Sequence, residues 1–233
     1  MLDLVCRCEV CGEETAYRFN KVYITPTSIG EAPALGGDHA CLFCGALNRL
    51  VPTAAGMTTI LQEIQVLTAT QGSEQEPPPS AISFIEPFKV NGEAVTALQA
   101  LSFYRPRLAR HPDDPRLLLL VGHINHRIGR YNECKRLFLQ CQMVDPASLE
   151  AGFFLAQIFT EEGEVQVAFE VLERLLQFRG RFTFHLLDRK SRKEMGSALA
   201  EMYNYIKRHL GIKKADLDPD FLSAHKVGRN DPC

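Results

Sequence analysis

The chain has 233 residues, of which 45% are hydrophobic, and its formal net charge is −2. This length can bury a sizeable core in one or two domains, and the near-neutral charge argues against a strongly basic nucleic-acid binder. No run of about eighteen apolar residues indicates a membrane helix. An acid and an arginine interrupt the first seven residues, where a signal peptide needs an apolar stretch, so we expect a cytoplasmic protein.

Two short cysteine motifs mark the N-terminal segment, since residues 8–12 and 41–45 both read C-x-x-C-G. In a reducing compartment this spacing is typical of metal ligation, and the glycine can adopt the positive φ that completes a tight turn. Two such turns facing each other predict a closed, structural Zn²⁺ site with no open position for catalysis. The predicted ligands are Cys8, Cys11, Cys41 and Cys44, while Cys6 and His39 stay open as replacement ligands.

The residues between and after these motifs predict a small β domain. Aromatic and β-branched residues favour a strand or hairpin over 15–25, and residues 48–52 favour a short strand. Together with the paired cysteine turns, residues 1–55 resemble the zinc ribbon family. The resemblance implies a small domain held together by zinc.

A helix and a linker are predicted next. Apolar residues at helical spacing between Met57 and Leu67 predict a short helix within 56–69. Residues 70–80 are polar and contain three consecutive prolines, so we predict a linker and a domain boundary there. Residues 81–90 are apolar but interrupted by a proline, which favours an extended arm against the helices that follow.

The region from Pro115 to Arg181 repeats with a period of about 34 residues, as stacked helix–turn–helix units do. The matched positions are Gly122 and Ala156, Gly129 and Gly163, Cys134 and Ala168, and Phe138 and Leu172. At these positions the chain resembles tetratricopeptide repeat proteins. A third, partial copy upstream lacks a recognisable first helix and has Pro106 inside its second. An ordinary helical hairpin domain with chance similarity is the alternative.

Helix ends and a final helix complete the predicted fold. Asp-Pro pairs at 114–115 and 145–146 predict capped helix starts, and Ser191 with Glu194 predicts a capping box. The last helix carries an apolar stripe that would cover the open end of the repeats, formed by Met195, Leu199, Met202, Ile206 and Leu210. The predicted fold class is mainly α, with a tetratricopeptide-like repeat domain over 81–211 after the β zinc ribbon.

Residues 226–233 resemble the start of the SEC-C motif, the zinc-binding tail of the preprotein translocase motor ATPase. In that family the run continues to a second cysteine and a final cysteine pair or cysteine–histidine, none of which follows Cys233 here. We therefore assign no metal to Cys233 and predict a tail over 212–233 with an incomplete motif. Either the chain is cut inside the motif or this copy has lost it. By analogy, the resemblance implies a link to secretion or chaperone machinery.

No nucleophile–base set, phosphate loop or open metal site emerges, so we predict a non-enzymatic protein. In the tetratricopeptide family the first helix of each pair lines a concave groove that holds a peptide, which implies a protein or peptide partner. The positions that match this groove are Arg116, Leu119, His123, His126, Glu150, Phe153, Gln157 and Thr160. Of these, Leu119 and Phe153 are expected to face water as an apolar patch.

The alternative function is nucleic-acid binding by the zinc ribbon, with help from the basic cluster between Arg189 and Lys193. The first fifty residues contain more acids than bases, however, and a basic run at a helix start is usually a solvated face. The sequence therefore favours a non-enzymatic interaction or adaptor protein.

Overall fold

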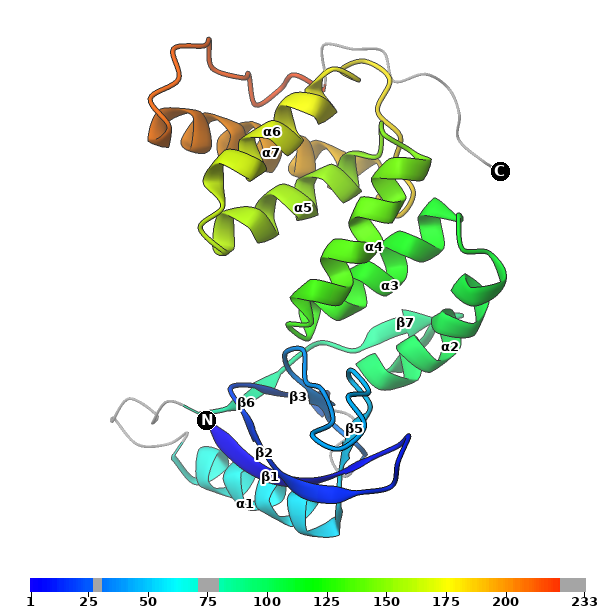
Figure 1. Ribbon diagram of the computed structural model, residues 1–233. Helices are drawn as coiled ribbons and strands as arrows, with labels where there is room; N and C mark the ends of the chain where they lie inside the picture. Colours follow the sequence, from blue (N-terminus) through cyan, green and yellow to red (C-terminus); the bar gives the residue numbers. More distant parts are fainter. Residues whose placement is uncertain (27–30, 71–79, 223–233) are drawn as a thin grey trace. The chain divides into compact units, whose positions relative to one another are not determined.

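The computed structural model describes residues 1–26, 31–70 and 80–222 (Figure 1). Its contacts divide the chain into two compact units, residues 1–106 with 124–133, and residues 107–123 with those from 134 onward. Each unit is described by itself below. None of the helices in the described ranges is long and apolar enough to span a membrane.

The first unit begins with a three-stranded antiparallel sheet in the order β2-β1-β5. The strands are β1 (Leu2–Cys8), β2 (Glu14–Phe19) and β5 (Leu50–Pro52). On β1 the residues alternate between buried and exposed, which is the period of a strand with one face on a core. A second sheet has the order β4-β3-β6 and contains β3 (Val22–Ile24) and β4 (Ala34–Leu35). The predicted strand segments at 15–25 and 48–52 are thus present.

The helix predicted within 56–69 is confirmed as α1 (Ala54–Thr70). Ile60 and Ile64 point into a core that they share with Leu4 and Phe19 of the sheet. Gly56 permits the close approach, because a Cβ there would lie 2.5 Å from the Val5 carbonyl oxygen. Burial of one apolar helix face against the sheet therefore stabilises this unit.

Residues after the predicted linker are extended, as expected, and form strands, and Arg127 at the end of a later helix donates to the Glu86 carbonyl oxygen at 3.1 Å. Strand β6 (Ile82–Phe84) pairs in parallel with β3, and β7 (Phe88–Val90) forms a hairpin with β8 (Glu93–Val95). The Asn91-Gly92 turn has positive φ at both residues, as a two-residue hairpin requires. By contacts, residues 81–106 group with the first unit. Residues 71–79 of the predicted linker lie outside the described residues.

The repeat predicted from the sequence corresponds to two helical hairpins. The first is α3 (Pro115–Arg127) with α4 (Tyr131–Val144), and the second is α5 (Leu149–Glu161) with α6 (Val165–Leu176). Gly129 and Gly163 follow the first helix of each hairpin with φ of 71° and 81°, as predicted for helix ends. A Cβ on Gly122 would lie 2.4 Å from the Phe138 ring, so this position must be small.

The partial third copy is represented by α2 (Ala97–Arg110) alone, preceded by the β7–β8 hairpin where a first helix would stand. The helix continues through Pro106, which lies inside it. Proline removes one backbone hydrogen bond there. The prediction that this copy lacks a first helix is confirmed.

Two predicted helix starts are wrong by about one turn. Helix α5 is capped by Ser148, whose hydroxyl accepts the Ala151 N–H, whereas Asp145 binds other groups. Helix α7 (Arg189–His209) is capped by Asp188, whose carboxylate accepts the Ser191 N–H at 2.8 Å. A carboxylate before the helix satisfies the free N–H groups better than a hydroxyl inside it, so the Ser191–Glu194 box does not form.

The second unit has its core between α5, α6 and α7. Leu199 and Ile206 of the predicted stripe are fully buried there, and the other three members are partly buried. Leu217 and Phe221, which lie in the predicted tail over 212–233, pack into the same core. Residues 223–233, including the SEC-C-like run and Cys233, lie outside the described residues.

Candidate metal centre and partner-binding surface

The two cysteine motifs form turns with the same backbone geometry. Gly12 donates its N–H to the Cys8 carbonyl at 2.9 Å, and Gly45 donates to the Cys41 carbonyl at 2.9 Å. Both glycines have positive φ, 80° and 71°, which a side chain would oppose. Each turn therefore presents its two thiols on the same side.

The four thiols meet in one cluster. The Sγ atoms of Cys8, Cys11, Cys41 and Cys44 all lie within 4.8 Å of one another. Cys8 and Cys44 are 3.7 Å apart, and Cys11 and Cys41 are 3.6 Å apart. Four sulfurs at about 2.3 Å from a tetrahedral zinc ion lie about 3.8 Å from one another. The donor set thus fits a metal ion that prefers four thiolates.

Backbone N–H groups donate to two of the four sulfurs, and they favour the thiolate form of Cys41. Val10 donates its N–H to the Cys8 sulfur and Phe43 donates to the Cys41 sulfur, both at 3.4 Å. The N–H of Cys44, followed by that of Phe43, lowers the pKa of Cys41 to about 6. Such N–H···S hydrogen bonds stabilise the negative charge of a thiolate, which a bound cation would otherwise have to neutralise alone.

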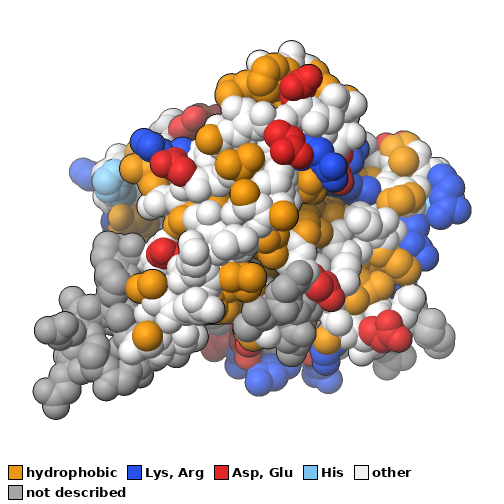
Figure 2. All heavy atoms as spheres, turned by 90° about the horizontal axis from the view of Figure 1, so that it is seen from below, with side chains coloured by type: hydrophobic (Ala, Val, Ile, Leu, Met, Phe, Trp, Pro, Cys, Tyr) orange, Lys and Arg blue, Asp and Glu red, His pale blue; other side chains and the backbone are white. Residues whose placement is uncertain are grey.

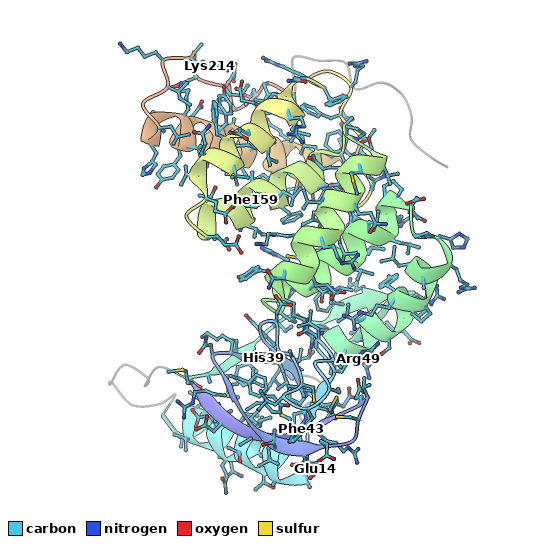
Figure 3. All side chains as sticks on the ribbon, in the orientation of Figure 1. Glu14, His39, Phe43, Arg49, Phe159 and Lys214 are labelled. Atoms are coloured by element: carbon cyan, nitrogen blue, oxygen red, sulfur yellow. The ribbon has the colours of Figure 1, made fainter. Side chains whose placement is uncertain are left out.

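Neither replacement ligand joins the cluster. Cys6 is buried in the sheet core, where burial raises the pKa of its thiol to about 12. His39 is labelled in Figure 3. Its Nε2 lies 2.8 Å from the Gly36 carbonyl oxygen, and its ring packs edge to face with that of Phe19. Within the described ranges, the metal-compatible group contains the four named cysteines and no other residue.

The tips of the two turns carry exposed apolar side chains. Leu42 is 72% exposed and Phe43 is 59% exposed, and Val10 and Leu47 are exposed as well. Figure 2 shows apolar side chains interspersed with charged ones on the face that it draws. Exposed apolar residues are common on protein surfaces, so these do not by themselves define a binding site.

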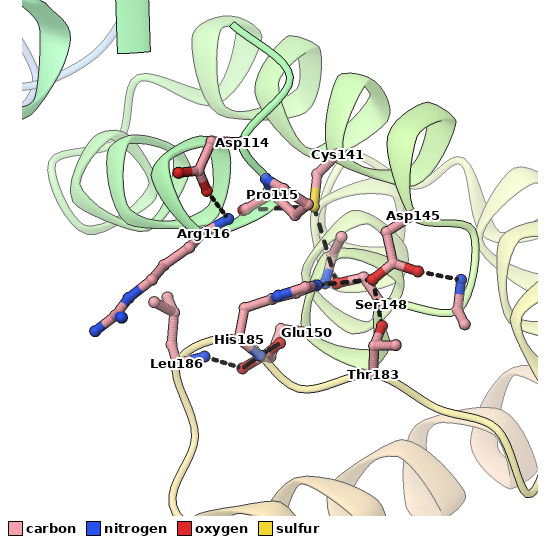
Figure 4. A network of polar contacts seen from close by, with 12 residues as sticks. Asp114, Pro115, Arg116, Cys141, Asp145, Ser148, Glu150, Thr183, His185 and Leu186 are labelled. Carbon is pink, nitrogen blue, oxygen red and sulfur yellow. Dashed lines mark hydrogen bonds and ion pairs between the residues drawn. The ribbon is translucent and has the colours of Figure 1, made fainter. Parts of the chain in front are cut away.

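Two of the predicted groove residues are buried. Leu119 is 1% exposed, so the expectation that it faces water is wrong. Glu150 is also 1% exposed. Its carboxylate accepts the backbone N–H groups of His185, Leu186 and Leu187 at 2.8–3.2 Å (Figure 4). Glu150 therefore holds a segment of this chain.

That segment is held at further points beside the start of α5. Thr183 donates its N–H to the Ala147 carbonyl and accepts the Leu149 N–H with its own carbonyl. Asp145 accepts the Thr183 hydroxyl and contacts His185 Nε2 (Figure 4). Residues 183–187 thus occupy the part of the α5 face that the sequence predicts for a partner.

The remaining groove positions differ in accessibility. Arg116 is exposed, whereas His123 is half-buried with its ring 5.3 Å from that of Phe154. Phe153 is half-buried against the core of the second unit. Gln157 donates to Glu161. His126 and Thr160 are also half-buried, His126 against the ring of Tyr131. An open apolar patch is therefore not present at these positions.

The sequence reasoning missed a buried arginine in the first unit. Arg130 is 4% exposed, and burial, followed by repulsion from Arg105, lowers its pKa to about 10. It lies in the α3–α4 turn, where Asn132 donates its N–H to the Asp38 carboxylate at 2.9 Å. Only its position after the helix-ending glycine distinguishes Arg130 in the sequence, and this indicates no burial.

Comparison with known proteins found similar solved structures but no matching family. No family model matches the chain, and no curated protein matches it. A solved structure of the Yersinia enterocolitica type III secretion chaperone SycD with a YopD peptide has 14% identity and a TM-score of 0.41, covering 66% of this chain and 95% of that one. MamA has 20% identity and a TM-score of 0.37, over 48% and 60%.

A Thermobaculum terrenum O-GlcNAc transferase mutant has 17% identity and a TM-score of 0.37, covering 66% of this chain and 24% of that one. These neighbours contain tetratricopeptide-like helical repeats. At these identities and TM-scores, the similarity supports no conclusion about a ligand or activity of this chain. By its own helices and strands, the chain is a mainly α protein with a tetratricopeptide-like repeat stack and a small N-terminal β module that carries a four-cysteine cluster.

Proposed function

We propose that this protein is a non-enzymatic adaptor that binds a protein or peptide partner through its helical repeats. The observation that supports the proposal is the repeated hairpin of α3–α4 and α5–α6, because stacked hairpins offer an extended surface to a partner. Arg116 is exposed and Gln157 is partly exposed on the first helices of the two hairpins, where a partner would meet them. The implied link to secretion or chaperone machinery rests on residues outside the described ranges and stays a prediction.

The proposal includes one structural Zn²⁺ per chain. Its ligands would be Cys8, Cys11, Cys41 and Cys44. The bound ion would cross-link the two turns and would leave no open coordination position. Its role would be to fix the loop of residues 36–48 on the sheet. The matched sulfur–sulfur distances and backbone N–H···S contacts support this assignment.

The partner-binding part is tested with a photo-crosslinking residue placed at Arg116 or at Gln157 in the full chain. Lys89, an exposed residue of the first unit, provides the matched control position. We expect the crosslinker at the first two positions to form a covalent adduct with a partner protein, and excess unlabelled chain should suppress this adduct. Equal adducts from all three positions would show nonspecific contact and contradict the proposal.

The metal part is tested by elemental analysis of the chain purified without chelator. One zinc per chain is expected, and Cys8→Ser with Cys44→Ser should remove it. A different metal, or no metal at stoichiometric level, would refute the zinc assignment and leave the repeat proposal standing.

A further inference from the structure

One surface of the second unit has a charge that differs from that of the whole chain. The fifteen residues from Arg179 to Lys193 contain six Lys or Arg and one Asp, although the chain has a net charge of −2. We name these six the α7 basic surface, and they are Arg179, Arg181, Arg189, Lys190, Arg192 and Lys193. Five of them are exposed, and Arg192 is half-buried. Such a concentration of positive charge attracts anionic partners.

The tertiary structure brings residues from the α6–α7 connection and from α7 to a common area. The Arg179 guanidinium lies 5.6 Å from the centre of the Phe221 ring, and Lys193 contacts the Asp220 carboxylate at 3.5 Å. Phe221 in turn meets Phe182 edge to face. The C-terminal segment therefore links the loop arginine to the lysine on the helix.

Arg192 connects the loop before α7 to the first turns of the helix. Its Nε donates to the Leu187 carbonyl oxygen at 2.9 Å, and its guanidinium lies 4.9 Å from the centre of the Phe184 ring. The loop before α7 is thus attached to the first turns of the helix. The basic side chains on both are presented by a fixed backbone.

The acids of this area are already engaged. Asp188 caps α7, Glu194 pairs with Lys190 at 3.7 Å, and Asp220 pairs with Lys193. Glu150 is buried under the amides of residues 185–187. The pairs with Lys190 and Lys193 are exposed, with lysine side chains 87% and 67% accessible. Exposed pairs of this kind are weak and can exchange for a partner's carboxylates.

Helix stability does not explain the basic residues at this position. The first turn of α7 contains no acid. The N-terminal end of a helix carries partial positive charge, so Arg189 and Lys190 are placed where cations are unfavourable. An anionic partner would be attracted both by the side chains and by the helix end.

We propose that the α7 basic surface binds an acidic peptide segment of the partner, an inference that rests on the proposed adaptor function. Arginine pairs with carboxylates through two parallel hydrogen bonds, which suits Asp- or Glu-rich segments. A peptide fits better than single-stranded nucleic acid, which needs exposed aromatic rings for base stacking. Phe182 and Phe184, the aromatic residues within this segment, are both partly buried and engaged.

The experiment measures fluorescence anisotropy of a labelled peptide of alternating Glu and Ala, with the full zinc-loaded chain, at low and at physiological salt. The variant carries Arg189→Glu, Lys190→Glu and Lys193→Glu. The control reverses three exposed lysines outside this surface, Lys21, Lys89 and Lys213. We expect about tenfold or greater loss of affinity for the variant and about twofold or less for the control.

Folding of the variant is checked by far-UV circular dichroism. The variant replaces the weak, exposed pairs of Lys190 and Lys193 by like charges, but acids in the first turn of α7 suit the helix dipole and offset this, so its helicity is expected to be kept. A labelled oligouridylate is measured in parallel, and tighter binding of it than of the peptide would overturn the proposal in favour of nucleic acid. Equal losses for variant and control, or no binding of the peptide by the wild type, would also overturn it. Crosslinking at Arg116 and Gln157 tests the adaptor function independently, so the two failures are distinguishable.

Discussion

Replacement of Glu150 by glutamine separates the two interpretations of α5. The sequence places this residue in an open groove, whereas the structure buries its carboxylate under three consecutive backbone N–H groups. Glutamine has nearly the same shape, but its side chain offers one uncharged acceptor oxygen in place of the two carboxylate oxygens. Its NH₂ group would face the backbone N–H groups as a second donor.

The magnitude follows from the hydrogen bonds. Oε1 of Glu150 accepts the N–H groups of Leu186 at 2.8 Å and Leu187 at 3.0 Å, and Oε2 accepts that of His185 at 2.9 Å. Hydrogen bonds to a charged group contribute about 1.5–3 kcal/mol, and a buried donor left without an acceptor costs about 1–3 kcal/mol. Since one or two of these bonds are lost, Glu150→Gln should lower the free energy of unfolding by about 2–4 kcal/mol.

The assay is urea unfolding of the full chain followed by circular dichroism. Glu161→Gln is the matched control, because Glu161 is exposed and bonds only a neighbouring glutamine side chain. The control should change the free energy of unfolding by less than about 0.5 kcal/mol. If Glu150→Gln costs no more than the control, the carboxylate does not hold residues 185–187, and the sequence-based groove assignment would regain support.

Three further outcomes are expected. Cys44→Ser should release the metal and speed amide hydrogen exchange in the cysteine turn and at residues 128–132. The second effect is expected because residues 128–132 hydrogen-bond the loop before the second cysteine motif. Unchanged exchange at 128–132 would contradict this coupling. Leu119→Ala should cost about 2–4 kcal/mol in urea unfolding, since the side chain is buried, and a cost near zero would place it in the groove. Asp188→Ala should lower the free energy of unfolding by about 1 kcal/mol, whereas Ser191→Ala should change it little; the reverse order would restore the predicted capping box.

The sequence by itself determined the local geometry of this protein. A glycine after each C-x-x-C pair sets a turn that only a residue tolerant of positive φ adopts readily, so the two thiol pairs could be predicted as metal ligands. The helix-ending Gly129 and Gly163 mark the repeat in the same way, because both have positive φ. These features depend on residues a few positions apart, so they can be predicted directly from the sequence.

The tertiary structure decided which faces remained open. Glu150 and Leu119 have the spacing of groove residues, but residues 183–187 arrive from more than thirty positions away and cover Glu150. Strand β6 likewise joins β3 across the predicted linker because an unpaired strand edge and buried apolar side chains favour pairing wherever the chain can reach. A hydrophobic pattern indicates that a helix or strand face is buried, and a buried polar group needs a hydrogen-bond partner. Which distant segment provides the burial or the partner depends on the packing of the whole unit, because burial is a property of all neighbours in space and not of spacing along the chain.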